Sequence, residues 1–107
     1  MKYGPRAYER EECAVERTLD IIGNRWTSLI VRELLWGPRR FNELCKNLQG
    51  ISPKTLSQRL VALEEKGILT RIHYPEIPPR VEYRLTEKGR SLAPIFEAMR
   101  DWGRRWT

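Results

Sequence analysis

The sequence is poor in the residues from which disulfide scaffolds, metal centres and many active sites are built. It has two cysteines, Cys13 and Cys45, and a single histidine, His73. Two cysteines are too few for a disulfide framework, so we expect reduced thiols and a cytoplasmic protein. No metal-ligand cluster, nucleophile motif or phosphate-binding glycine loop is recognisable. The sequence therefore predicts no enzymatic activity, no metal and no cofactor.

Long apolar runs are missing as well. No uninterrupted apolar stretch approaches the ~20 residues that cross a membrane, and no signal-peptide pattern opens the chain. The 107 residues fit one small domain, and 40% hydrophobic and 32% charged residues indicate a globular protein. A domain of this size is close to the lower limit for an independent core, so dimerisation is a plausible source of extra stability.

The net charge of +6 is unevenly distributed along the chain. Residues 1–36 contain six basic and six acidic residues, whereas residues 37–107 contain fourteen basic and eight acidic ones. Fifteen of the twenty basic residues are arginines, whose planar guanidinium suits phosphate and guanine. A basic half is compatible with nucleic acid, an anionic membrane or an acidic protein, so the fold has to decide between these partners.

Apolar residues spaced by three and four predict a series of helices in the first part of the chain. The first three predicted helices cover residues 13–22, 26–35 and 41–48. The segment GISPKTLSQRLVALEEKG, residues 50–67, predicts a fourth helix, because Ser52 suits the N-cap and Gly67 suits the exit. Three leucines point to the core in this helix: Leu56, Leu60 and Leu63.

The pattern changes after Gly67. Residues 68–74 and 80–85 are rich in β-branched and aromatic residues, and a proline-rich turn separates them, which predicts a β-hairpin. Thr86 suits the N-cap of a last helix, which we expect Pro94 to kink. Three helices, a recognition-like helix, a hairpin and a final helix together predict a winged helix-turn-helix fold, mainly α with a small β-hairpin.

Three stretches of the sequence resemble the HxlR-type bacterial transcriptional regulators. They are CAVERTLDIIGNRWTSLIVRELLWGPRRFNEL, ISPKTLSQRLVALEEKGILTR and YPEIPPRVEYRLTEKGRSL, and the resemblance covers about residues 13–102. It implies a homodimeric winged-helix protein that binds double-stranded DNA, usually as a repressor and sometimes as an activator. The chain departs from the family at Asn24-Arg25, often Gly-Lys, and at Ala14, often Pro; neither site lies on the predicted DNA surface.

The first turns of the fourth helix are expected to enter the major groove. Gln58 suits a bidentate pair with adenine, and Lys54 can reach guanine or a phosphate. Arg80 either enters the minor groove or forms a salt bridge with a neighbouring glutamate, and Arg40 either clamps phosphate or forms a structural salt bridge. The predicted DNA-binding residues are Arg39, Arg40, Ser52, Lys54, Thr55, Ser57, Gln58, Arg59 and Arg80.

The chain divides into three predicted parts. Residues 1–12 form an N-terminal arm, residues 13–91 the winged helix-turn-helix domain, and residues 92–107 a dimerisation helix. The last helix is too apolar for a lone terminal helix, so we expect it to pair with a second copy, with packing inside one chain as the alternative. The predicted interface residues are Tyr8, Val15, Ile95, Phe96, Met99, Trp102 and Trp106.

Cys13 is the candidate regulatory residue. In some members of the family that this chain resembles, a cysteine at this position near the dimer interface senses oxidants or electrophiles. Arg10 and Arg17 would favour a thiolate and the nearby glutamates would oppose it, so an inert thiol is the alternative. Cys45 falls on an apolar face and is expected in the core. A small ligand between subunits, a regulator without effector and a winged-helix protein-interaction module remain further possibilities.

Overall fold

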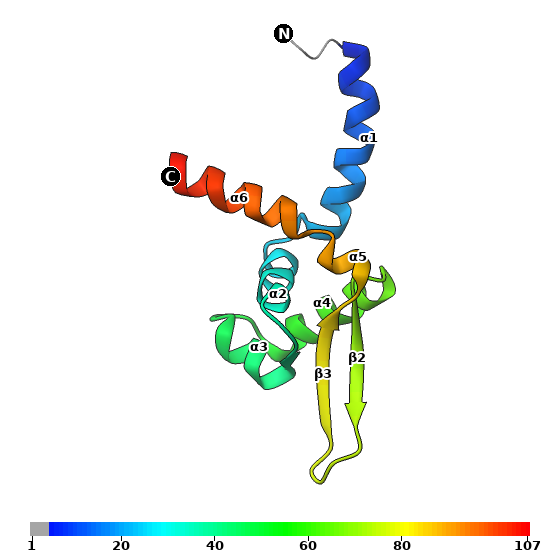
Figure 1. The fold of residues 1–107 in the computed structure, drawn as a ribbon, viewed down its shortest axis with the longest axis vertical. Helices are drawn as coiled ribbons and strands as arrows, with labels where there is room; N and C mark the ends of the chain where they lie inside the picture. Colours follow the sequence, from blue (N-terminus) through cyan, green and yellow to red (C-terminus); the bar gives the residue numbers. More distant parts are fainter. Residues whose placement is uncertain (1–4) are drawn as a thin grey trace.

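The structure is a computed structural model that describes residues 5–107, with side chains from residue 13 onward. It is mainly helical with one small antiparallel sheet (Figure 1), which confirms the predicted winged helix-turn-helix fold. In chain order the elements are α1 (Pro5–Ile22), α2 (Arg25–Leu35), β1 (Arg39–Arg40), α3 (Phe41–Asn47), α4 (Pro53–Glu65), β2 (Leu69–Tyr74), β3 (Arg80–Leu85), α5 (Glu87–Arg90) and α6 (Ala93–Trp106).

The sheet has the strand order β1-β3-β2. Strands β2 and β3 form the predicted hairpin, in which Leu69 lies opposite Leu85 and Tyr74 lies opposite Arg80. The two-residue strand β1 pairs with the outer edge of β3. The sequence did not reveal β1, because two residues are too short to show a strand period. This pairing fixes the segment between α2 and α3 against the middle of β3.

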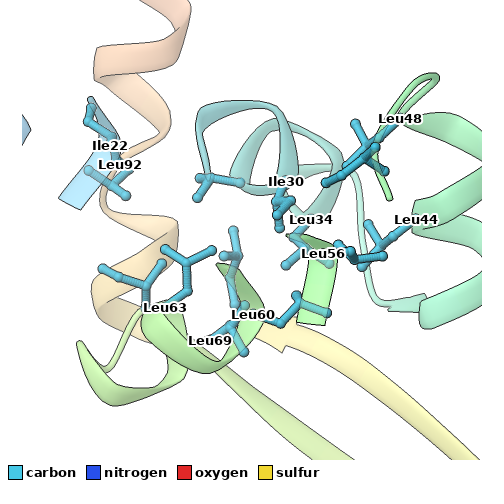
Figure 2. Close-up of a cluster of buried hydrophobic side chains, with 14 residues drawn as sticks. Ile22, Ile30, Leu34, Leu44, Leu48, Leu56, Leu60, Leu63, Leu69 and Leu92 are labelled. Atoms are coloured by element: carbon cyan, nitrogen blue, oxygen red, sulfur yellow. The ribbon is translucent and has the colours of Figure 1, made fainter. Parts of the chain in front are cut away.

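The core is a layer of aliphatic side chains between α2, α3, α4 and the hairpin (Figure 2). Ile30 and Val31 of α2 are completely buried. The leucines that α4 was predicted to turn inward are buried too: Leu56, Leu60 and Leu63. Because α4 is anchored by this single stripe, its opposite side stays free.

Helix α1 is longer than the sequence predicted. Its start at Pro5 means that residues 5–12, expected to form an arm, continue the helix expected from residue 13, while residues 1–4 lie outside the described residues. The segment lacks apolar periodicity, but it contains alanine, arginine and glutamate, which favour helix, and proline suits the first helical position. The Lys66 ammonium donates to the carbonyl of Asp20 and so ties α1 to the end of α4.

The last helix is interrupted, which contradicts the expected single helix with a kink at Pro94. A short α5 is followed by α6, and Pro94 lies in the first turn of α6. Proline fits there because the first turn of a helix needs no N–H donor inside the helix. Thr86 caps α5 as predicted, since its hydroxyl oxygen accepts a hydrogen bond from the Gly89 N–H at 3.1 Å.

Gly89 lies where α5 packs on the hairpin, and no side chain fits there. A Cβ on Gly89 would lie 2.2 Å from the carbonyl oxygen of Ile68. We expect Gly89→Ala to lower the free energy of unfolding by about 1–3 kcal/mol, because the backbone of the hairpin must shift. Urea unfolding followed by circular dichroism measures the change.

Gly103→Ala in α6 is the matched control. The nearest atom to a Cβ there is the Thr107 hydroxyl oxygen at 4.0 Å, so the methyl group meets no obstacle. The same substitution should then raise helix stability by roughly 0.5–1 kcal/mol. Equal effects at the two glycines would contradict the close packing of α5.

Candidate nucleic-acid interface

The start of α4 is fixed by a local hydrogen-bond network. The Ser52 hydroxyl oxygen accepts a hydrogen bond from the Thr55 N–H at 3.1 Å, and the same hydroxyl donates to Thr55 Oγ1 at 2.9 Å. Pro53 occupies the first helical position. These contacts hold the first turn in one geometry, as the sequence predicted, and they engage both hydroxyls within the cap.

Beyond the cap, α4 presents a polar row to solvent. Lys54, Ser57 and Gln58 are exposed, whereas Thr55 and Arg59 are partly buried. Val61 lies one turn after Gln58 and is 53% exposed. The sequence analysis missed Val61 as a candidate contact. An exposed β-branched side chain three residues after Gln58 was the available signal, because apolar groups contact the methyl group of thymine.

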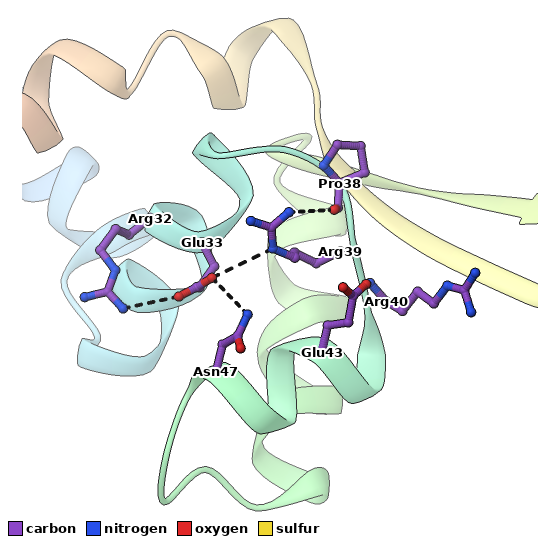
Figure 3. Close-up of polar contacts among 7 residues, drawn as sticks. All are labelled: Arg32, Glu33, Pro38, Arg39, Arg40, Glu43 and Asn47. Carbon is purple, nitrogen blue, oxygen red and sulfur yellow. Dashed lines mark hydrogen bonds and ion pairs between the residues drawn. The ribbon is translucent and has the colours of Figure 1, made fainter.

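Arg39 and Arg40 play different parts in the structure (Figure 3). Arg39 Nη1 donates to the carbonyl oxygen of Pro38 at 3.0 Å, and its Nε lies 3.9 Å from Glu33 Oε2. Glu33 also accepts from Asn47 Nδ2 at 3.4 Å, so these three residues connect α2 to α3. Arg39 is thus engaged in holding the two helices together.

The side chain of Arg40 is exposed and forms no ion pair within the described residues. Its backbone N–H donates to Glu43 Oε1 at 2.9 Å, which fixes the start of α3. The structural salt bridge considered for Arg40 is therefore made by Arg39. Arg40 lines an open groove of about 800 Å³ between the start of α3 and the end of the hairpin that adjoins the turn. A guanidinium in this position is available to a phosphate group.

Arg80 occupies the end of the hairpin and is surrounded by partners. Its Nη2 lies 3.1 Å from Glu76 Oε1 and its Nη1 lies 3.5 Å from Glu82 Oε2. The guanidinium carbon also lies 3.9 Å from the centre of the Tyr74 ring. The side chain is only 25% exposed, so the structure contains the salt-bridge alternative for Arg80. A contact with DNA in the minor groove stays a prediction that would have to disrupt these pairs.

A second ion pair connects the hairpin to α4. Arg71 Nε lies 3.3 Å from Glu64 Oε1, and Tyr83 lies beside this pair. Burial raises the pKa of Tyr83 above its ordinary value of 10.0; Arg71 opposes the rise and Glu64 adds to it. The Tyr83 phenol is therefore neutral near pH 7. The ion pair between Arg71 and Glu64 holds α4 and the hairpin in a defined relative position.

Helices α1 and α6 project from the body at the end opposite the hairpin (Figure 1) and carry exposed apolar side chains. Among the predicted interface residues, those exposed are Val15, Ile95, Met99, Trp102 and Trp106. Phe96 is half-buried against the core, as the alternative of packing within one chain requires. The side chain of Tyr8 lies outside the described residues. Leu19, four residues after Val15 and equally exposed, was missed despite this helical spacing.

The two cysteines have different surroundings. Cys13 is exposed, and Arg17 Nη1 donates to its sulfur at 2.7 Å. Cys45 is partly buried against the core, as predicted. Cys13 is therefore the more accessible of the two thiols, and a guanidinium lies next to its sulfur.

Comparison with known proteins shows to which protein family this chain belongs. Residues 21–107 match the family model described as HxlR-like helix-turn-helix. The chain belongs to this family. The match confirms the resemblance to HxlR-type regulators that the sequence indicated. A winged-helix fold with an exposed recognition helix agrees with this family.

Curated relatives of this HxlR-like chain are described as HTH-type transcriptional regulators. The chain is 47% identical over 94 residues to the HTH-type transcriptional regulator sll1512 of Synechocystis, which covers 88% of this chain and 70% of that protein. It is 44% identical over 96 residues to the HTH-type transcriptional regulator YdeP of Bacillus subtilis, which covers 90% and 75%. Family and relatives are regulators of transcription, not enzymes, in agreement with the sequence analysis.

Solved structures of similar regulators superpose closely. The redox regulator HypR in its oxidised form matches with a TM-score of 0.84 and 41% identity over 89% of this chain and 98% of that one. Reduced YodB from B. subtilis matches with a TM-score of 0.77 and 36% identity over 97% and 94%. The HxlR-like chain is thus a DNA-binding transcriptional regulator with a winged helix.

Two further findings concern the described part of the chain. None of its helices combines the length and apolar character that a membrane span requires. Its histidine, cysteine, aspartate and glutamate side chains do not gather into a group that could hold a metal ion.

Proposed function

We propose that this regulator acts in the cytoplasm as a homodimeric repressor on an inverted-repeat operator. The observation that carries the proposal is the arrangement of α4, which is anchored through three buried leucines and capped at Ser52. Lys54, Ser57 and Gln58 are consequently held outward on a rigid helix. Side chains that project from the first turns of such a helix read bases in the major groove.

Phosphate contacts would position the protein on the duplex. The free guanidinium of Arg40 and the exposed ammonium of Lys54 are the strongest candidates. Arg59 is partly buried, so it would reach the backbone from the side of the helix. Arg39 contributes indirectly, because its contacts with Glu33 and Pro38 fix the segment that carries Arg40.

The proposed dimer rests on the exposed apolar faces of α1 and α6. Trp102 is 63% exposed and Val15 is 54% exposed, which is unfavourable for a lone chain in water. A two-fold axis through these helices would present two copies of α4 to one duplex, and the operator would then be an inverted repeat. A repressor of this kind acts by occupying promoter DNA.

Binding to DNA at several salt concentrations tests the proposal. The fluorescence anisotropy of labelled fragments from upstream of the neighbouring genes is compared with that of a scrambled fragment. We expect one fragment to bind at least 10³-fold more tightly than the scrambled one, with an affinity that falls steeply as salt rises. The rival function, a winged-helix interaction module, predicts weak binding without preference for any fragment.

Oxidant sensing at Cys13 is the proposed mode of regulation. The support is the exposed thiol beside Arg17 and the likeness to HypR, a redox regulator. Peroxide would transfer one oxygen atom to the Cys13 sulfur, so that the thiol becomes a sulfenic acid and the peroxide is reduced to water. We expect peroxide to change operator affinity at least tenfold in the wild type and to leave Cys13→Ser unchanged.

Cys45→Ser is the matched control for this experiment, because Cys45 is the more buried thiol. It should respond to peroxide as the wild type does. An unaltered response of Cys13→Ser would remove the redox mechanism but not DNA binding, and regulation by a small ligand between the subunits or a regulator without effector would remain.

A further inference from the structure

The tip of the hairpin has a surface that phosphate binding does not explain. Four of its five residues are apolar and exposed: Pro75, Ile77, Pro78 and Pro79. Ile77 is fully exposed, more so than any other large apolar side chain of the described residues. We propose that Ile77 is the DNA-contacting residue of the wing, that it enters the minor groove as an apolar wedge, and that Arg80 positions it. This inference rests on the proposed function.

The first step is that the tip is rigid. Three prolines fix the backbone dihedral φ of the turn, and the Glu76 N–H donates to the carbonyl oxygen of Tyr74 at 2.8 Å. Strand pairing of Tyr74 with Arg80 closes the turn at its base. A rigid tip loses little conformational entropy when it binds, which is what a wedge requires.

The second step is that Arg80 is engaged by the protein itself. Its guanidinium lies between Glu76 and Glu82, at 3.1 Å and 3.5 Å, and is stacked on Tyr74. To grip a phosphate it would have to give up two carboxylates. Its present contacts join the turn to both strands, so Arg80 acts as a positioning residue. The tip is left without a free positive charge. Apart from Glu76, whose exposed carboxylate pairs with Arg80, its exposed residues are apolar.

The third step is the location of the tip. The hairpin extends from the body at the end opposite α1 and α6 (Figure 1), where the proposed dimer does not cover it. The residues of the hairpin next to the tip, Pro79 to Glu82, line the same groove as Arg40, one of the proposed phosphate contacts. Isoleucine is one of the side chains that proteins insert between base steps in the minor groove, where it partly unstacks the bases and bends the duplex. Among the partners that an apolar surface can take, this position favours DNA.

An apolar wedge has a thermodynamic signature that distinguishes it from an ionic contact. It excludes water from the groove but releases no counterions, so its loss weakens binding without changing the slope of log affinity against log salt. It also bends the DNA, which energy transfer between dyes at the two ends of a short operator duplex can measure.

The test compares Ile77→Ala, Ile77→Leu and Ile77→Lys on the operator. We expect Ile77→Ala to weaken binding about tenfold, to reduce the bend and to keep the salt slope, whereas Ile77→Leu retains both affinity and bend. All three should unfold in urea as the wild type does, because the side chain touches no core residue. Unchanged affinity and bend in Ile77→Ala would overturn the proposal. So would tighter binding by Ile77→Lys, because the tip would then lie beside phosphates.

The role of Arg80 is tested by Arg80→Lys and Arg80→Gln. A positioning residue predicts that both variants reduce the bend equally and leave the salt slope unchanged, because lysine cannot make the stacked, two-carboxylate contact. If Arg80→Lys kept wild-type affinity and Arg80→Gln showed a shallower slope of log affinity against log salt, Arg80 would instead be a phosphate contact. If the wild type itself bound no DNA fragment specifically, the proposed function would be contradicted. If the wild type bound specifically and Ile77→Ala bound equally well, only the wedge would be contradicted.

Discussion

Replacing Lys54, Thr55 and Gln58 together by alanine is expected to lower operator affinity by roughly 10²–10⁴-fold. A bidentate pair between Gln58 and adenine is worth about 1–3 kcal/mol, and a dimer loses it in both half-sites. Loss of the Lys54 ammonium removes a phosphate or guanine contact and makes the salt dependence shallower. Anisotropy titrations at one fixed salt concentration, followed by a salt series, measure both effects.

The triple variant should remain folded, which keeps the result interpretable. Lys54 and Gln58 are exposed. Thr55 contributes its hydroxyl to the cap, but the Ser52 oxygen still accepts the N–H of residue 55 after the substitution. Glu65→Ala, at the far end of the same exposed row, is the control and should not weaken binding. If the triple variant bound the operator as tightly as the wild type, α4 could not be the recognition helix.

Local signals allowed α4 to be predicted almost residue by residue. Its cap, its first proline, its leucine stripe and its exit at Gly67 all depend on neighbours within one or two turns. The inward stripe follows from the 3.6-residue period, and the exposed row is its complement. The family resemblance then supplied the function of that row, which a helical wheel alone could not.

The sequence could not predict which arginines form contacts within the protein and which stay free. Arg39 and Arg40 are adjacent and chemically identical, and only the pairing of β1 with β3 turns one toward Glu33 and the other toward solvent. The choice between salt bridge and free contact at Arg80 likewise depends on Tyr74, which the strand register places opposite Arg80, and on Glu82, two residues further along the same strand. Such contacts depend on how turns and paired strands orient each side chain, and periodicity contains no information about that orientation.

At two other places, the start of α1 and the break before α6, the local sequence pattern predicted a structure that differs from the observed one. Residues 5–12 lack an apolar period, which predicts an arm, yet most of them are good helix formers and they form the start of α1. Pro94 was expected inside a helix because the apolar residues of its neighbourhood continue on both sides. The chain instead ends one helix after Arg90 and begins another at Ala93.

Trp102→Asp is expected to convert the proposed dimer into a monomer and to lower operator affinity by about 10³-fold or more. The indole is 63% exposed on α6, so the substitution costs the single chain little, whereas a carboxylate in an apolar interface is strongly unfavourable. One half-site then has to bind alone. Light scattering gives the molar mass, and anisotropy on the intact operator gives the affinity.

Arg104→Asp introduces the same side chain on the opposite face of α6, two residues further along the helix, and should leave both mass and affinity close to wild type. The comparison separates the effect of the position from that of the new charge. A Trp102→Asp variant that stays dimeric would place the interface elsewhere. A monomer that still binds the full operator with wild-type affinity would show that one α4 is sufficient, and the inverted-repeat operator would no longer follow from the exposed faces of α1 and α6.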